Sequence, residues 1–164
     1  LGAIKDGTLD PKAEPEVVGE NAGTAQVNGH GTFGQVVATM AARLAIKKAR
    51  ESGISLVTMG NLNHTGRVGT YPEMAAEEGM AAIMYDCGIG STGHQVAPFG
   101  GREGRLGTNP VSMSFPASAD KVVTADYSYP FLAHATPHTA LTEGRLEPRR
   151  ADQRIGPVPG LPEP

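Results

Sequence analysis

The chain has little cysteine, few aromatic residues and no long apolar run, and each shortage excludes a class of protein. Its 164 residues include one cysteine, Cys87, and no tryptophan, and aromatic residues make up 5%. A single cysteine excludes an internal disulfide framework and is typical of a reducing compartment, so we expect a cytoplasmic protein. No apolar stretch approaches the length that crosses a bilayer, so we expect no membrane partner.

The charge balance is mildly acidic. The chain has 14 basic and 17 acidic residues, a net charge of −3 and no basic run, so nucleic acid is not an expected partner. The length suits one domain, and a hydrophobic content of 39% is enough for a core. Because the chain begins with Leu1 rather than methionine, we expect it to be a fragment of a longer protein.

The first half reads as strand, helix, strand, helix and strand, which is the order of a βαβ sheet with neighbouring parallel strands and predicts an α/β fold. Residues 1–20 are expected to be the end of one element followed by a polar connector. The expected elements are a strand at residues 24–28, a helix at 33–52, a strand at 54–59, a helix at 67–78 and a strand at 80–85. Gly53 is expected to end the first helix, and the strand at 54–59 is apolar enough to be buried on both faces. Two more strands are expected at residues 111–115 and 121–125.

Two segments lack such periodicity. Residues 88–109 are rich in glycine and are expected to form a long loop, of the kind that is usually functional or disordered. Within it, Thr108 and Asn109 add hydrogen-bonding groups just before a strand, although a solvated surface hairpin is the alternative. Residues 129–164 hold seven of the thirteen prolines and are expected to be a disordered tail.

His64 is the best catalytic candidate by position and chemistry. It lies between the expected strand at residues 54–59 and the expected helix at 67–78, where rigid elements would hold its side chain. An imidazole exchanges a proton near neutral pH, which suits a general acid or base. The alternative is a histidine that caps or packs a loop.

Two other motifs are weaker. The segment Gly29-His30-Gly31-Thr32-Phe33-Gly34 follows a strand and opens a helix, as a Rossmann pyrophosphate turn does. The following strand ends without an acidic residue, so we favour glycines that allow a tight turn and close helix packing. His134 and His138 have the spacing of two metal ligands on a helix, but Pro137 would break that helix, so no metal site is expected.

Several stretches together resemble the malate/L-lactate dehydrogenase family of NAD(P)-dependent 2-hydroxyacid oxidoreductases, which is unrelated to the Rossmann lactate dehydrogenases. They are Gly31 to Gln35, Asn63-His64-Thr65-Gly66-Arg67, Glu73 to Met80, Val96 to Arg102, Gly107-Thr108-Asn109-Pro110 and Asp126-Tyr127-Ser128. The resemblance runs from about Lys5 to Ser128. The resemblance implies that residues 1–128 are a fragment of the catalytic domain, and it leaves residues 129–164 as a divergent tail.

The resemblance implies a three-layer α/β/α fold with a mixed sheet that binds NAD or NADP without a Rossmann domain, incomplete in this chain. It implies that His64 is the catalytic acid or base, that the substrate is a small 2-oxo or 2-hydroxy acid, and that the protein is a homodimer. The implied cofactor-binding residues, with the two loop residues included, are Asp126, Tyr127, Ser128, Gly88, Thr108 and Asn109.

The chain also departs from the family pattern. An upstream helical segment with a Ser-His-Gly-type motif is absent, and Tyr129-Pro130 replaces the Thr-Ser that follows Asp126-Tyr127-Ser128 in the family. We therefore expect little activity from this chain alone. A Rossmann-type nucleotide-binding module and a non-catalytic remnant stay open as alternatives.

Overall fold

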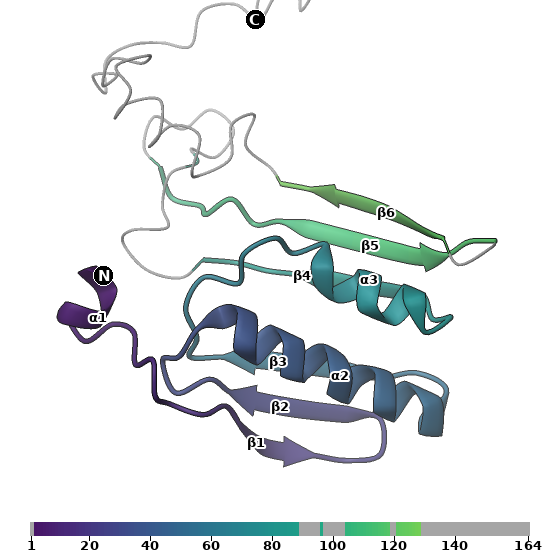
Figure 1. Cartoon of the computed structure of the whole chain (residues 1–164), viewed down its shortest axis with the longest axis horizontal. Coiled ribbons are helices and arrows are strands. Elements are labelled where there is room, and N and C mark those ends of the chain that lie inside the picture. The colour runs from purple at the N-terminus through teal and green to yellow at the C-terminus, as the bar shows by residue number, and fades with distance from the viewer. Residues whose placement is uncertain (1, 89–95, 97–103, 119–120, 129–164) are drawn as a thin grey trace, which may run out of the picture. The chain divides into compact units, whose positions relative to one another are not determined.

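A computed structural model describes residues 2–88, 96, 104–118 and 121–128 (Figure 1). The chain divides into two units, of which the first comprises Leu1–Asp86 and Pro110–Tyr127, and the second comprises Cys87–Asn109 and Ser128–Pro164. The helices and strands below belong to the first unit, which opens with a short helix α1 (Gly2–Lys5). In the second unit, the described residues include an antiparallel bridge between Val96 and Leu106. The predicted tail lies outside the described residues.

The first sheet has the strand order β1-β2-β3. Strands β1 (Glu16–Glu20) and β2 (Thr24–Asn28) form an antiparallel hairpin, and β2 runs parallel to β3 (Leu56–Gly60). Helix α2 (Gly34–Ser52) makes the crossover between these parallel strands. It ends at Gly53, whose φ of 83° is the left-handed conformation that glycine adopts without strain.

Helix α2 covers one face of this sheet because its apolar residues recur at helical spacing. Val37 and Ala41 pack against Val27 of β2 to form a buried cluster. Partly buried apolar side chains surround the cluster: Val17, Met40, Leu44, Val57, Met59 and Leu62.

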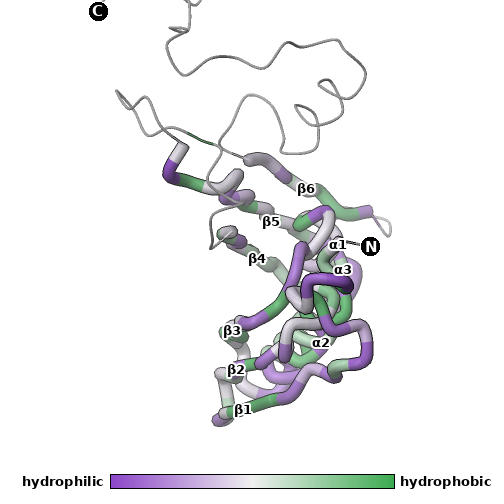
Figure 2. Tube along the Cα trace, turned by 90° about the vertical axis from the view of Figure 1, so that its left-hand side faces the viewer, coloured by the Kyte–Doolittle hydropathy of each residue, from purple (hydrophilic) through white to green (hydrophobic). Residues whose placement is uncertain are grey.

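The second sheet has the strand order β4-β5-β6, and both of its pairings are antiparallel. Its strands are β4 (Ala82–Tyr85), β5 (Val111–Pro116) and β6 (Val122–Tyr127), and helix α3 (Thr70–Glu77) contacts all three. Both α2 and α3 lie on the same side of the strands (Figure 2). The other face of the second sheet carries exposed apolar side chains, among them Ile83, Tyr85, Val123 and Tyr127.

The structure confirms the mixed α/β class, the strand at residues 24–28 and the long helix with its glycine end. Four details were wrong. The first 20 residues contain β1, which the polar composition concealed, because its apolar contact comes from pairing with β2. The strand predicted at residues 54–59 begins at Leu56 and is covered on one face only, so that Leu56 is 63% exposed.

The second predicted helix begins at Thr70 instead of residue 67, because residues 67–69 form a turn in which the N–H of Thr70 bonds the carbonyl oxygen of Arg67 three residues before it. Strand β4 pairs with β5 rather than with β3, so the parallel pairing is limited, among the described strands, to β2 and β3. No helix in the described ranges is long and apolar enough to cross a membrane.

Candidate functional site

The loop between β3 and α3, residues 61–69, carries His64. It begins at the carboxyl end of the parallel pair β2 and β3, which is the edge where α/β proteins bind ligands. Asn61 turns the chain away from β3 with a positive φ of 53°. Asn63 then ties the loop to the turn before α2, because its Nδ2 donates to the carbonyl oxygen of Gly31 at 2.7 Å.

The glycines of the motif Gly29 to Gly34 make room for this loop. A Cβ on Gly34 would lie 2.0 Å from the carbonyl oxygen of Asn63, and a Cβ on Gly29 would lie 2.7 Å from that of Asn61. The protein's own loop therefore fills the space above both glycines. This confirms the prediction that these glycines allow close packing, and it removes the open backbone that a Rossmann pyrophosphate turn needs.

His64 is exposed, and one of its ring nitrogens has a local partner. Its Nδ1 accepts the backbone N–H of Gly66 at 3.1 Å. Gly66 can place its N–H there because of its left-handed φ of 78°, which a residue with a side chain rarely adopts. The other ring nitrogen, Nε2, is the one left to meet a ligand.

The residue after the histidine is held on both its side chain and its main chain. Thr65 is 4% exposed, and its Oγ1 donates to Asp86 Oδ2 at 2.5 Å. Its carbonyl oxygen accepts the hydroxyl of Tyr71, which is 5% exposed. Burial raises the pKa of Tyr71, and the nearby Asp86 carboxylate raises it further, so the phenol stays protonated and donates.

The far end of the loop is held by ionic contacts. Arg67 forms a bidentate salt bridge with Glu73, with Nη–Oε distances of 2.6 and 2.7 Å. Its Nε lies 3.3 Å from Asp126 Oδ2. The same Asp126 oxygen accepts the backbone N–H of Gly69 at 3.2 Å. The hydrogen bond from Arg67 holds the pKa of Glu73 below its ordinary value, and the bond to Glu73 raises the pKa of Arg67.

The structure links some of the predicted site residues and not others. Asp126 contacts the loop that carries His64, through Gly69 and Arg67. Tyr127, 51% exposed, points to the opposite face of β6 because side chains alternate along a strand. The other predicted cofactor-binding residues belong to the second unit, whose position relative to the loop is not determined. They are Gly88, Thr108, Asn109 and Ser128.

Sequence reasoning missed three residues that hold the loop: Thr65, Tyr71 and Asp86. Asp86 carried the one available signal, since it is a carboxylate directly after an apolar strand. The other two become informative only when the partners across the fold are known.

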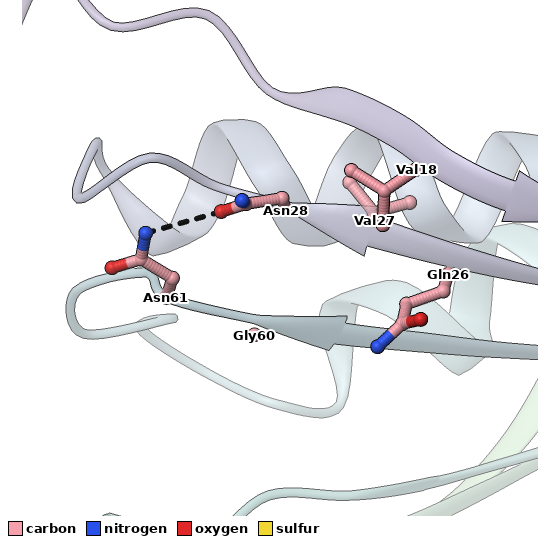
Figure 3. Close-up of a pocket in the computed structure, with 6 residues that line it drawn as sticks. All are labelled: Val18, Gln26, Val27, Asn28, Gly60 and Asn61. Carbon is pink, nitrogen blue, oxygen red and sulfur yellow. Dashed lines mark hydrogen bonds between the residues drawn. The ribbon is translucent and has the colours of Figure 1, made fainter.

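A shallow hollow of about 230 Å³ lies beside the ends of β2 and β3 (Figure 3). Its lining residues are Val18, Gln26, Val27, Asn28, Gly60 and Asn61. Asn28 Oδ1 accepts both Asn61 Nδ2 at 3.1 Å and the His30 N–H at 2.9 Å, so the two asparagines brace the turn. Within the part of the chain that the structure describes, no three His, Cys, Asp or Glu residues lie close enough to hold a metal ion. His134 and His138 lie outside that part.

The sequence and the fold of the chain match a known family. A family model described as malate/L-lactate dehydrogenase matches residues 1–150. The chain belongs to the malate/L-lactate dehydrogenase family. The solved malate dehydrogenase of Entamoeba histolytica superposes on 87% of this chain with a TM-score of 0.77 and 29% identity. The sulfolactate dehydrogenase of Methanocaldococcus jannaschii superposes on 87% with a TM-score of 0.73 and 34% identity.

Family members with assigned activities are similar in sequence as well. The L-sulfolactate dehydrogenase of M. jannaschii is 40% identical over 121 residues, which make up 74% of this chain and 34% of that enzyme. The malate dehydrogenase of Pyrococcus horikoshii is 43% identical over 116 residues, which make up 70% of this chain and 31% of that enzyme. The chain thus spans about a third of the length of the family members it matches.

Proposed function

We propose that this chain contributes the histidine-bearing part of an oxidoreductase that transfers a hydride between NAD or NADP and a small 2-hydroxy or 2-oxo acid. The observation that supports this most is His64 itself: an exposed imidazole, on a loop braced at several points, in a chain of the malate/L-lactate dehydrogenase family. The similar enzymes carry the names malate, L-lactate and L-sulfolactate dehydrogenase, which all denote 2-hydroxyacid substrates.

The proposed role of His64 follows from the charge that such a reaction creates. When bound, the nicotinamide supplies or accepts the hydride at the carbon that carries the hydroxyl or oxo group. When the 2-oxo acid is reduced, negative charge develops on the substrate oxygen, and a positioned N–H group lowers the barrier by sharing its proton with that oxygen; in the reverse direction the hydroxyl proton passes to the same nitrogen. We assign this task to Nε2 of His64, because Nδ1 is already bonded to Gly66.

The cofactor-binding residues remain proposals: Asp126, Tyr127, Ser128, Gly88, Thr108 and Asn109. Among the described residues, strand β6 offers backbone groups that a nicotinamide cofactor could bind. Among the strands that the structure describes, β6 is an edge of the second sheet, so its backbone N–H and C=O groups suit the carboxamide of a nicotinamide. Asp126 is engaged by Arg67 and Gly69, so we expect its side chain to hold the loop and its backbone to meet the cofactor.

Further proposals follow from the family resemblance and the composition. We expect the assembled enzyme to be a homodimer in the cytoplasm and this chain alone to have little activity. The substrate is proposed only as a class, because the similar enzymes have different 2-hydroxy acids in their names.

A chimera tests the function without requiring the chain to act alone. Residues 1–128 would replace the matching third of the M. jannaschii sulfolactate dehydrogenase, and the hybrid would be assayed with malate, lactate and sulfolactate. We expect turnover, and we expect His64→Ala in the hybrid to lower kcat by about 100-fold or more while cofactor binding is retained.

His30→Ala is the matched control, because His30 is also exposed and lies in a loop outside residues 61–69. Normal turnover by the His64→Ala hybrid would refute the catalytic assignment. A folded hybrid that binds neither NAD nor NADP would favour the non-catalytic remnant instead.

A further inference from the structure

The peptide group between Thr65 and Gly66 makes a hydrogen bond on each side. Its carbonyl oxygen accepts the Tyr71 hydroxyl, and its N–H donates to His64 Nδ1 at 3.1 Å. The carbonyl and the N–H belong to one planar unit, so a contact that orients one of them orients the other. Tyr71 and the ring of His64 are therefore connected through a single rigid group.

The Tyr71 end of this connection is fixed. The tyrosine lies in the first turn of α3 and is buried, so its hydroxyl has one orientation toward the Thr65 carbonyl. Burial and the Asp86 carboxylate raise the pKa of the phenol, which keeps the proton that it donates. Hydrogen bonds in series polarise one another, so donation to the carbonyl also makes the Gly66 N–H a better donor.

The peptide group is also prevented from turning over. The Thr65 side chain is bound to Asp86 at 2.5 Å and is almost fully buried. A flip of the peptide plane would break the Tyr71 bond and leave a buried carbonyl oxygen without that partner, which costs free energy. Gly66 keeps the left-handed φ of 78° that aims its N–H at the imidazole.

We propose that Tyr71 is a positioning residue which, through the Thr65–Gly66 peptide group, holds the neutral ring of His64 in the tautomer with its proton on Nε2. A neutral imidazole has one donor and one acceptor nitrogen. Because Nδ1 is the acceptor of the Gly66 N–H, the proton resides on Nε2, the nitrogen that faces away from the loop contact.

The chemical consequence rests on the function proposed above. In this tautomer, Nε2–H donates a hydrogen bond to the substrate oxygen as negative charge develops there. A ring with protons on both nitrogens would turn its Nδ1–H against the Gly66 N–H. The Gly66 contact therefore leaves Nε2, rather than Nδ1, to meet the substrate oxygen.

The tautomer can be measured in the unmodified chain. In protein labelled with ¹⁵N, the two-bond and three-bond couplings of the ring identify which nitrogen carries the proton, and a coupling across the hydrogen bond links Gly66 N to His64 Nδ1. A His64→Gln spectrum identifies the signals of this residue among the five histidines. We expect the Nε2–H tautomer and the cross-bond coupling. A dominant Nδ1–H tautomer would overturn the proposal.

The contribution of Tyr71 is measured with Tyr71→Phe, which removes one hydroxyl and keeps the ring. We expect the ratio of Nε2–H to Nδ1–H to fall, by no more than the roughly fivefold change that a whole hydrogen bond represents, because Tyr71 acts on the ring only through the intervening peptide group. Tyr85→Phe is the matched control, since Tyr85 is exposed on β4 and should leave the ratio unchanged. Equal ratios in the two variants would overturn the role of Tyr71.

A second measurement covers the case in which Tyr71→Phe does not fold. Replacing the four tyrosines with 3-fluorotyrosine keeps their shape and makes each hydroxyl a stronger donor. We expect the Gly66 amide proton to move downfield, and an unmoved Gly66 signal would contradict the connection. No cofactor or substrate is present in these experiments. Their result is therefore independent of the chimera assay, and either proposal can be refuted while the other stands.

Discussion

Helices α2 and α3 each cover one face of a three-stranded sheet, but the residues beneath them differ in kind. Beneath α2, the first sheet buries aliphatic side chains, with Val27 and Val37 almost completely enclosed. Beneath α3, the second sheet buries hydroxyl groups. Ser112 and Ser114 have no exposed surface, and Ser114 Oγ lies 3.0 Å from Thr124 Oγ1.

The two kinds of buried residue have different consequences: one affects the stability of the unit, and the other affects the orientation of the histidine loop. Burial of aliphatic surface is favourable and non-directional, so the first sheet contributes free energy without fixing orientation closely. Hydrogen bonds are directional, and those on the second sheet and α3 reach the histidine loop through Asp126, Asp86 and Tyr71. The first sheet therefore stabilises the unit and holds the start of the loop through Asn28 and Gly31, whereas the second sheet and α3 orient the residues around His64.

The largest effect should come from the aliphatic cluster. Val37→Ala removes two buried methyl groups at a position with no exposed surface, so we expect the free energy of unfolding to fall by about 2 kcal/mol or more. Val36→Ala makes the same chemical change at the preceding, exposed position of α2 and should have little effect. Denaturant unfolding of both variants measures the difference. Equal decreases in the free energy of unfolding for Val36→Ala and Val37→Ala would show that burial beneath α2 does not account for the stability of the first sheet.

A smaller effect is expected on the second sheet. Ser114→Ala leaves the Thr124 hydroxyl without its strand partner, and the loss of one such bond predicts a decrease of about 1 kcal/mol in the free energy of unfolding. Ser118→Ala, at an exposed position beyond β5, is the control in the same unfolding experiment. If Ser114→Ala lowered the free energy of unfolding as much as Val37→Ala does, the second sheet would contribute to stability as strongly as the first.

The smallest effect concerns the Arg67–Glu73 pair and depends on pH. The pKa of Glu73 is lowered in the folded state, so its contribution to stability is present above the ordinary value of 4.5 and is lost as pH falls through the folded value. Glu73→Gln should therefore cost less than about 1 kcal/mol at neutral pH, and its difference from the original protein should vanish in acid.

Glu77→Gln, on the exposed side of the same helix, is the matched change in charge. A Glu73→Gln deficit that persists at low pH would indicate that packing, rather than the ion pair with Arg67, accounts for it. Unfolding midpoints measured across the acid range separate the two.

Sequence patterns predicted what is local. Helix α2 has apolar residues at helical spacing and a glycine at its end, and the strand at residues 24–28 follows directly from alternation. The close packing at Gly34 and the position of His64 between a strand and a helix were also predictable, since neighbouring segments create both.

The remaining features depend on distant partners. Thr65 and Asp86 are 21 positions apart, and Gly69 and Asp126 are 57 apart, so no local pattern could predict either hydrogen bond. The same reason explains β1, whose apolar contact comes from its pairing with β2. The uncovered face of β3 was missed because an apolar strand has the same sequence whether one or both faces are covered.

The contact between Gly66 and His64 also determines what a genetic screen can detect. The atoms that meet the imidazole and the Tyr71 hydroxyl at residues 65 and 66 are a backbone N–H and a backbone C=O, which every residue but proline carries, although only glycine holds residue 66 at its φ of 78° without strain. Proline alone lacks the N–H, and its fixed φ near −65° is incompatible with 78° at residue 66. A scan of side chains would therefore report strain at Gly66 and a lost Asp86 contact at Thr65, while the atoms that orient the ring would go unnoticed.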